Sequence, residues 1–210
     1  MKIAVIGATG KAGSKILEEA LARGLSVTAI VRSASKLTKD VPFIEKDVLS
    51  LTTQDLEGFD AVVQAFGAPI GQEEQHVIVG RHLIDILSGI STRLIVVGGA
   101  GSLFVDPELT TRVVDTPDFP EMFLATAKNQ MQNLLDLQVS NMTWTFISPS
   151  AFFDPAGGRT GSYTLGQDRL LVNRAGESYI SYADYAIAVV DEIEKRAHMN
   201  QRFTVVAEKA

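Results

Sequence analysis

The chain has 210 residues, which is enough for one domain with a substantial core. Its net charge is −6, so a nucleic-acid-binding surface is not expected. It contains no cysteine, which excludes disulfides, a thiolate nucleophile and a thiolate metal site. No apolar run approaches the roughly 20 residues that span a bilayer, and Met1 leads directly into a strand-like segment that leaves no room for a signal peptide. We therefore expect a cytoplasmic protein with no membrane contact.

The first predicted strand, Lys2 to Ile6, runs into a glycine-rich turn that opens a helix. The turn reads Gly7-Ala8-Thr9-Gly10-Lys11-Ala12-Gly13. In a nucleotide-binding turn, Gly7 permits a tight bend, Gly10 lets the backbone approach a pyrophosphate, and Gly13 lets the helix pack close to the strand. The free N–H groups and the positive end of the helix dipole then face the anion.

This pattern predicts a dinucleotide site that uses Gly7 and residues 9–13, with a plain structural turn as the alternative. A kinase-type phosphate loop is rejected, because Ala12 stands where Ser or Thr would have to follow the lysine.

The remaining predicted elements alternate between strands and helices along the chain. We expect helices at 15–23, 73–90, 121–139 and 181–196. We expect strands at 26–31, 42–47, 60–66, 93–97, 142–147 and 202–206. Short, nearly continuous apolar strands that alternate with helices indicate a parallel sheet covered on both faces. The chain is therefore predicted to form a single α/β domain, a Rossmann-type doubly wound parallel sheet.

Two segments interrupt the alternation, at 102–120 and at 148–176. They follow the fifth and sixth predicted strands, and ligands of such sheets bind beyond the carboxyl ends of the strands. We expect both segments to be substrate loops of the same domain, with ordinary surface loops as the alternative. Their aromatic side chains are expected either to hold a flat ring or to pin the loops to the core. These side chains are Phe104, Phe152, Phe153 and Tyr163.

The end of the second predicted strand bears on which nucleotide is bound. An Asp or Glu about 20 residues past the glycines binds the ribose hydroxyls of NAD, but this chain has Arg32 there. An arginine can fork onto a 2′-phosphate, and Lys36 is close enough to add charge. The sequence therefore favours NADP over NAD, with a solvated basic loop as the alternative.

Further cofactor contacts are expected where the third to sixth strands end. Asp47, which precedes Val48, is expected to accept from the adenine amino group or to cap the following turn. Small residues after the next strands would let the backbone approach the cofactor. The remaining expected cofactor contacts are Ala65, Phe66, Gly67, Gly98, Gly99, Ser148 and Pro149.

Six short segments together resemble one family. They are Val5-Ile6-Gly7-Ala8-Thr9-Gly10, Val31-Arg32, Asp47-Val48, Val96-Val97-Gly98-Gly99-Ala100-Gly101-Ser102, Ile147-Ser148-Pro149-Ser150 and Ser181-Tyr182-Ala183-Asp184-Tyr185-Ala186. These segments are similar to those of the atypical short-chain dehydrogenase/reductases, and within them of bacterial NAD(P)H-flavin reductases and biliverdin-IXβ/flavin reductases. The resemblance implies hydride transfer from NAD(P)H to a flat conjugated acceptor, with flavin as a substrate rather than a tightly bound cofactor. One alternative is a non-catalytic redox sensor that binds the dinucleotide and acts through a protein partner. Another is an epimerase- or isomerase-like enzyme that keeps its nucleotide bound.

The resemblance also bears on the catalytic residues. Typical short-chain dehydrogenases carry Tyr-x-x-x-Lys, and here Lys128 is present but Leu124 replaces the tyrosine. Ordinary alcohol–ketone chemistry is therefore not expected, and Lys128 either holds the ribose or is a plain exposed lysine. Ser102 matches a serine that lies near the substrate in biliverdin-IXβ-like reductases, whereas the histidine that these enzymes carry after the sixth strand is absent. This absence argues against tetrapyrrole reduction. The candidate catalytic residues are Ser102 and Lys128.

The three histidines do not have the spacing of a metal site. His76 and His82 are six residues apart on one predicted helix, so they face different directions, and His198 lies far along the chain. We therefore expect no metal, a small-molecule acceptor, and a monomer or weak homodimer.

Overall fold

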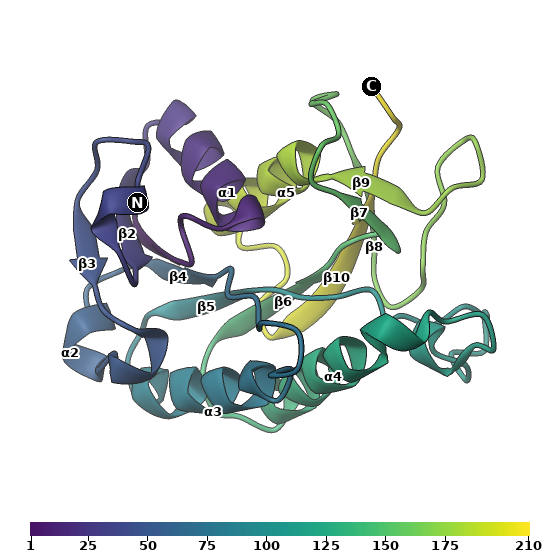
Figure 1. Cartoon of the computed structure of the whole chain (residues 1–210), viewed down its shortest axis with the longest axis horizontal. Coiled ribbons are helices and arrows are strands. Elements are labelled where there is room, and N and C mark those ends of the chain that lie inside the picture. Colours follow the sequence, from purple (N-terminus) through teal and green to yellow (C-terminus); the bar gives the residue numbers. More distant parts are fainter.

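Strands and helices alternate along most of the chain in the computed structural model, which describes residues 1–210 (Figure 1). The strands are β1 (Lys2–Ile6), β2 (Ser26–Val31), β3 (Phe43–Glu45), β4 (Ala61–Gln64), β5 (Arg93–Val97), β6 (Trp144–Ser148), β7 (Phe152–Asp154), β8 (Thr164–Gly166), β9 (Tyr179–Ser181) and β10 (Gln201–Val206). The α-helices are α1 (Lys11–Ala22), α2 (Thr53–Leu56), α3 (Gln75–Leu87), α4 (Leu124–Gln138) and α5 (Tyr182–Lys195). Short 3₁₀ helices lie at Ala34–Lys36, Val48–Ser50, Val113–Asp115 and Glu121–Phe123.

Eight strands form one sheet in the order β3-β2-β1-β4-β5-β6-β10-β8. All neighbouring pairs are parallel except β10 and β8, which are antiparallel. The strand order reverses between β1 and β4, and in such sheets ligands bind outside the carboxyl ends of the strands at this switch point. The predicted Rossmann-type doubly wound sheet is confirmed, and β8 adds an antiparallel edge strand to it.

Helices α1 and α5 cover one face of the sheet, and α3 and α4 cover the other (Figure 1). Alternate strand residues point to opposite faces, so Ile3 and Val5 pack on the side of α1 and α5, whereas Ala4 and Ile6 pack on the side of α3 and α4. Burial on both faces explains why the strand sequences are almost continuously apolar. No helix of the structure is both long enough and apolar enough to cross a membrane.

The predicted strands at 26–31 and 93–97 have the same bounds in the structure. The helix expected at 121–139 instead starts as a 3₁₀ turn after Pro120, and α4 begins at Leu124. Segment 148–176 was expected to be loop, but it contributes β7 and β8. These three-residue strands exist because they pair with β9 and β10, which are distant in sequence.

Arg23, at the end of α1, ties this helix to α5. Its Nη1 donates to Asp191 at 2.5 Å and to Glu194 at 3.0 Å. Tyr163 joins the same cluster, because its hydroxyl donates to Asp191 at 2.8 Å. Burial opposes ionisation of Asp191, but hydrogen bonds from Lys195, Arg23 and Tyr163 outweigh it and hold the pKa of this carboxyl at about 2. The cluster therefore anchors the segment before β8 to the α1–α5 layer.

Candidate cofactor and acceptor site

The glycine-rich turn between β1 and α1 packs backbone against backbone. Gly7 has a φ of +76°, and a Cβ added to it would lie 2.7 Å from the carbonyl oxygen of Ala65, just after β4. A Cβ added to Gly13 would overlap the carbonyl oxygen of Gly7. The turn is therefore wedged between β4 and the first turn of α1, where side chains would not fit.

The start of α1 presents unpaired backbone donors. Gly10 precedes the helix and supplies no side-chain cap. The first helical bond runs from the N–H of Ser14 to the carbonyl oxygen of Gly10 at 2.9 Å, so the N–H groups of residues 11–13 have no acceptor within the helix. With the positive end of the helix dipole, these groups form a site suited to an anion.

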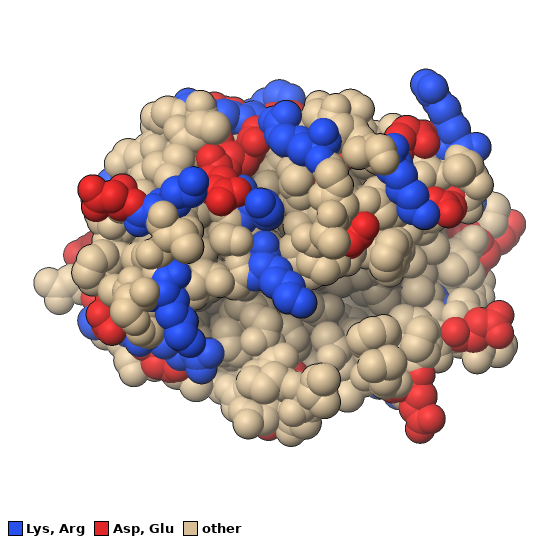
Figure 2. All heavy atoms as spheres, turned by 45° about the horizontal axis from the view of Figure 1, so that its top comes forward, with Lys and Arg blue, Asp and Glu red and all other residues tan.

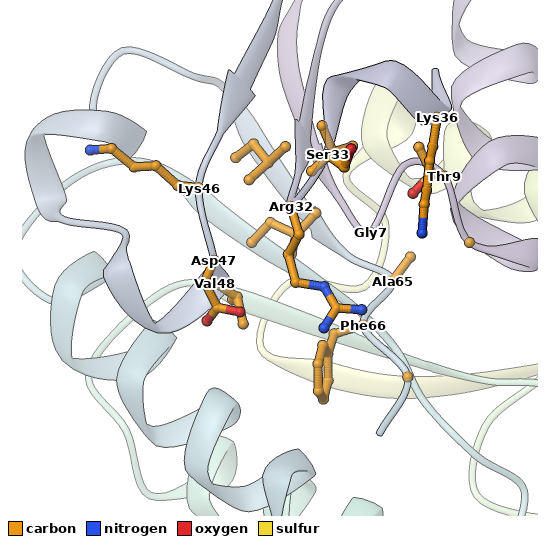
Figure 3. Close-up of a pocket in the computed structure, with 15 residues that line it drawn as sticks. Gly7, Thr9, Arg32, Ser33, Lys36, Lys46, Asp47, Val48, Ala65 and Phe66 are labelled. Atoms are coloured by element: carbon orange, nitrogen blue, oxygen red, sulfur yellow. The ribbon is translucent and has the colours of Figure 1, made fainter. Parts of the chain in front are cut away.

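A cavity of about 630 Å³ opens beside this turn, beyond the carboxyl ends of β1, β2 and β4 (Figure 3). We call it the first cavity. The predicted cofactor residues that line it are Gly7, Thr9, Gly10, Arg32, Lys36, Asp47, Val48, Ala65, Phe66 and Gly67. Ile6, Ile30, Val31, Ser33 and Lys46 complete its lining. The predicted contacts Lys11, Ala12 and Gly13 are not part of this lining, but they supply the free N–H groups at the start of α1.

Three basic side chains line the first cavity, and only one of them is paired with a carboxylate. Lys46 is held by Asp55 in an ion pair of 2.7 Å. Arg32 and Lys36 are exposed and make no ion pair within the chain, and the Arg32 side chain extends across the cavity toward Phe66 (Figure 3). These two side chains are available to an anionic ligand.

Asp47 lines the same cavity and caps the 3₁₀ helix that follows it. Its Oδ1 accepts from the N–H of Leu49 at 2.9 Å. The capping role that the sequence left open is therefore present, and the adenine contact stays a prediction.

Behind the first cavity, the ring of Phe66 meets His76 edge to face, with centroids 5.8 Å apart. His76 is buried, and burial lowers the pKa of its imidazole, so the ring is neutral at physiological pH. His82 contacts the carbonyl oxygen of Leu51 through Nε2 at 3.0 Å, and His198 contacts Glu192. The three histidines thus lie in separate surroundings.

A second cavity of about 680 Å³ lies beyond the carboxyl ends of β5 and β6. Among the predicted site residues, Gly98, Gly99, Pro149, Phe152 and Phe153 line it. The segment 102–120 contributes Val113, Thr116, Asp118, Phe119 and Pro120. Residues 149–153 come from the other irregular segment, so both segments contribute to the walls of one cavity, which we call the second cavity.

Aromatic rings form much of the second cavity. Phe123, before α4, and Phe152, in β7, are 53% and 55% exposed, so each offers apolar surface to a ligand. Phe153 packs on Tyr182 with ring centroids 3.9 Å apart. Burial, and to a lesser degree the charge of Asp154, raises the pKa of the Tyr182 hydroxyl, which therefore stays protonated at neutral pH.

The structure brings neither candidate catalytic residue to either cavity. Ser102 is buried, and its hydroxyl accepts from Nη1 of Arg202 at 3.1 Å. Lys128 is exposed, and the 100° step of the α-helix directs it away from the face on which Thr126, Ala127 and Gln130 line the second cavity. Ser102 thus has a structural contact in place of a ligand-facing one.

Three more predicted contacts also lie outside the two cavities. Ser148 is fully buried, and its Oγ has no hydrogen-bond partner. Phe104 bridges to Arg112 and Arg169 and lies under the Arg112 guanidinium at 5.3 Å. Tyr163 is held by Asp191. Phe104 and Tyr163 therefore pin the irregular segments to the body of the protein, which is the alternative that the sequence left open.

Comparison with known proteins adds independent information on this arrangement. A family model described as NAD(P)H-binding matches residues 7–196. The uncharacterised protein YwnB of Bacillus subtilis (strain 168) is 62% identical over 211 residues, which cover 99% of each chain. A crystal structure from Streptococcus pneumoniae TIGR4, described provisionally as an NADH-flavin reductase, has 47% identity and a TM-score of 0.95 over 99% of this chain and 100% of that one. A crystal structure from Bacteroides thetaiotaomicron, described provisionally as an epimerase, has 38% identity and a TM-score of 0.88 over 100% of this chain and 98% of that one.

Proposed function

Because the chain belongs to the NAD(P)H-binding family, we propose that it is an NADPH-dependent reductase that transfers hydride to a flat conjugated acceptor, with a flavin as the leading candidate. The observation that carries the proposal is the pairing of two chemically different cavities at one edge of the sheet. The first cavity is lined by glycines and basic side chains, and the second by aromatic rings. They follow β4 and β5, which are neighbours in the sheet, so a dinucleotide and an acceptor can meet between them.

The residues of the first cavity fit a dinucleotide. The cradle at Gly7 and Gly13 leaves no room for a Cβ, and the free N–H groups at residues 11–13 suit a pyrophosphate. Arg32 and Lys36 have no acidic partner to release before they bind a 2′-phosphate. The absence of an Asp or Glu at the end of β2 agrees with this preference for NADPH.

The second cavity fits a planar acceptor. When bound, NADPH supplies the hydride, and one proton from solvent completes the two-electron reduction. The protein holds the acceptor against Phe123, Phe152 and Phe153 and keeps water away from the reacting faces. Fully burying one such aromatic side chain contributes about 1.5–3 kcal/mol. The provisional description of the Streptococcus pneumoniae protein as an NADH-flavin reductase supports flavin as the acceptor.

The direct test measures the oxidation of NADPH through the fall in its absorbance, with riboflavin, FMN and small quinones as acceptors. We expect a rate that saturates with at least one acceptor. Tight binding of NADPH without oxidation by any acceptor would overturn the reductase proposal. That result would favour the alternative, a redox sensor that works through a protein partner.

Arg32→Ala tests the choice of nucleotide. Removing the guanidinium takes away a charge-assisted contact to the 2′-phosphate, which is worth about 1.5–3 kcal/mol. We expect KM for NADPH to rise roughly 30-fold, and KM for NADH, which lacks this phosphate, to change by less than about threefold. Steady-state kinetics with both nucleotides and one acceptor measures the difference.

Lys46→Ala is the matched control, since Lys46 lines the same cavity but is already paired with Asp55. It should leave the ratio of the two KM values almost unchanged. An equal effect of Arg32→Ala on NADPH and NADH would show that Arg32 does not read the 2′-phosphate.

A further inference from the structure

The two cavities differ sharply in charge. The first has Arg32, Lys36 and Lys46 in its lining. The second has no Lys, Arg or His among its 19 lining residues, and its only carboxylate is Asp118. Of these two cavities, only the first offers cationic side chains to a phosphate group.

The segment that forms one wall of the second cavity has a net negative charge. Between residues 106 and 121 it carries Asp106, Glu108, Asp115, Asp118 and Glu121 against one basic residue, Arg112. The Arg112 guanidinium lies over the ring of Phe104. The carboxylate of Asp106 accepts hydrogen bonds from the N–H groups of Thr110 and Thr111, both at 2.7 Å. Asp118 is exposed, lines the cavity and forms no ion pair.

Figure 2 shows the charged side chains around the central hollow. Lys and Arg side chains lie on its left and at its upper right, and Asp and Glu side chains project at its lower right. Because Asp118 forms no ion pair, a ligand in the second cavity lies close to uncompensated negative charge, and the lining offers a phosphate no cationic partner.

The lining provides uncharged polar groups instead. Thr126, Gln130 and Tyr182 reach the cavity together with the aromatic rings. A hydroxyl and an amide can pair with carbonyl and N–H groups at the edge of a heterocycle without a formal charge on either partner.

From this arrangement we propose that the second cavity selects phosphate-free planar acceptors, so that riboflavin is bound in preference to FMN, and that Asp118 is a main determinant of this selection. The proposal rests on the reductase function proposed above. It assigns the phosphate contacts of the reaction to the nucleotide and leaves the acceptor to be recognised by its ring.

A binding measurement tests the proposal without using turnover. The protein is saturated with NADP⁺, and riboflavin and FMN are titrated separately while quenching of flavin fluorescence is recorded. We expect riboflavin to bind roughly tenfold more tightly than FMN, because the phosphate places about two negative charges near Asp118. The difference should shrink as salt is raised from about 0.01 to 0.5 M, since exposed charges are screened.

Asp118→Asn should narrow the gap between the two flavins several-fold, and Asp118→Lys should reverse it. Glu108→Gln is the matched control, because Glu108 lies in the same acidic segment but not in the lining of the cavity. It should change the gap by less than about twofold.

The outcomes separate this proposal from the reductase function. Equal or tighter binding of FMN, or no binding of either flavin, overturns the selection, even where a quinone oxidises NADPH and the reductase function stands. Selective riboflavin binding that Asp118→Lys reverses supports the proposal. If no acceptor then oxidises NADPH, the reductase function fails, whereas the selectivity of the cavity remains.

Discussion

Gly13→Ala should lower the affinity for NADPH by about 100-fold, which corresponds to losing one or two hydrogen bonds to a charged group at about 1.5–3 kcal/mol each. The added Cβ would overlap the carbonyl oxygen of Gly7 and crowd the backbone of Ala8. Because both neighbours are backbone, no side chain can rotate away, and α1 has to move off the turn. The free N–H groups of residues 11–13 would then lose their position. Titration of NADPH fluorescence measures the loss, and circular dichroism shows whether the fold is kept.

Two other glycines, which flank α1, make the prediction specific. At Gly10 a Cβ meets only the Gly7 carbonyl oxygen, at 3.1 Å, so Gly10→Ala should weaken binding less than Gly13→Ala. Gly24, past the other end of the helix, has a φ of +76° but open space around a Cβ. Gly24→Ala should therefore cost roughly 1–2 kcal/mol of stability while leaving the affinity unchanged. Wild-type affinity in Gly13→Ala would show that the close packing of this turn is not needed for binding.

The parts of the fold that the sequence predicts well are those set by local patterns. Strands β2 and β5 are uninterrupted apolar runs between turn residues, and their bounds match the prediction. In contrast, β7, β8 and β9 contain three residues each and lie in segments that resemble loops. They are strands only because distant segments pair with them, which a local pattern does not report.

The site residues also fall into those that a local sequence pattern predicts and those that it does not. The turn after β1 and Arg32, which follows β2, are recognised from the sequence, because one strand places each of them. Asp118 lies in the segment 102–120 that was expected to be a substrate loop, although it was not singled out. Phe123, Gln130 and Tyr182 were not predicted to line a site, because helix periodicity alone does not show which residues near α4 and α5 the folded loops meet. The one available signal was the position of Tyr182 at the start of the last helix, inside a segment that carried the family resemblance.

Arg93→Ala should destabilise the protein by about 3–5 kcal/mol, the usual cost of leaving one partner of a buried ion pair alone. Arg93 and Glu192 are each 3% exposed. The Arg93 guanidinium donates to the carboxylate of Glu192 and to the hydroxyl of Thr145, and its Nη1 donates to the carbonyl oxygen of Glu192 at 3.2 Å. Without it, the carboxylate keeps only His198, through Nδ1 at 2.7 Å and the backbone N–H at 2.9 Å. Urea unfolding at pH 7.5 measures the loss.

The pH dependence of this loss follows from Glu192. Burial alone would raise the pKa of its carboxyl, but hydrogen bonds from His198 and Arg93 outweigh burial and lower it in the wild type. The wild type therefore loses this contribution to stability as pH falls below the unfolded-state value, about 4.3. In Arg93→Ala the pKa of Glu192 should rise, so proton uptake by the folded state becomes favourable and the gap between the two proteins should narrow toward pH 5.

Two comparisons identify the buried charge as the cause. Arg81 pairs with Asp136 at 2.7 Å but is 63% exposed, and Arg81→Ala should cost less than about 1 kcal/mol. Replacing both partners, Arg93→Met with Glu192→Leu, should recover most of the stability, because no unpaired charge remains. Arg93 begins β5 and lies at the amino-terminal ends of the strands, whereas both cavities lie beyond the carboxyl ends. NADPH affinity should therefore be unchanged in folded Arg93→Ala. A double variant as unstable as Arg93→Ala would instead assign the loss to packing around the strand.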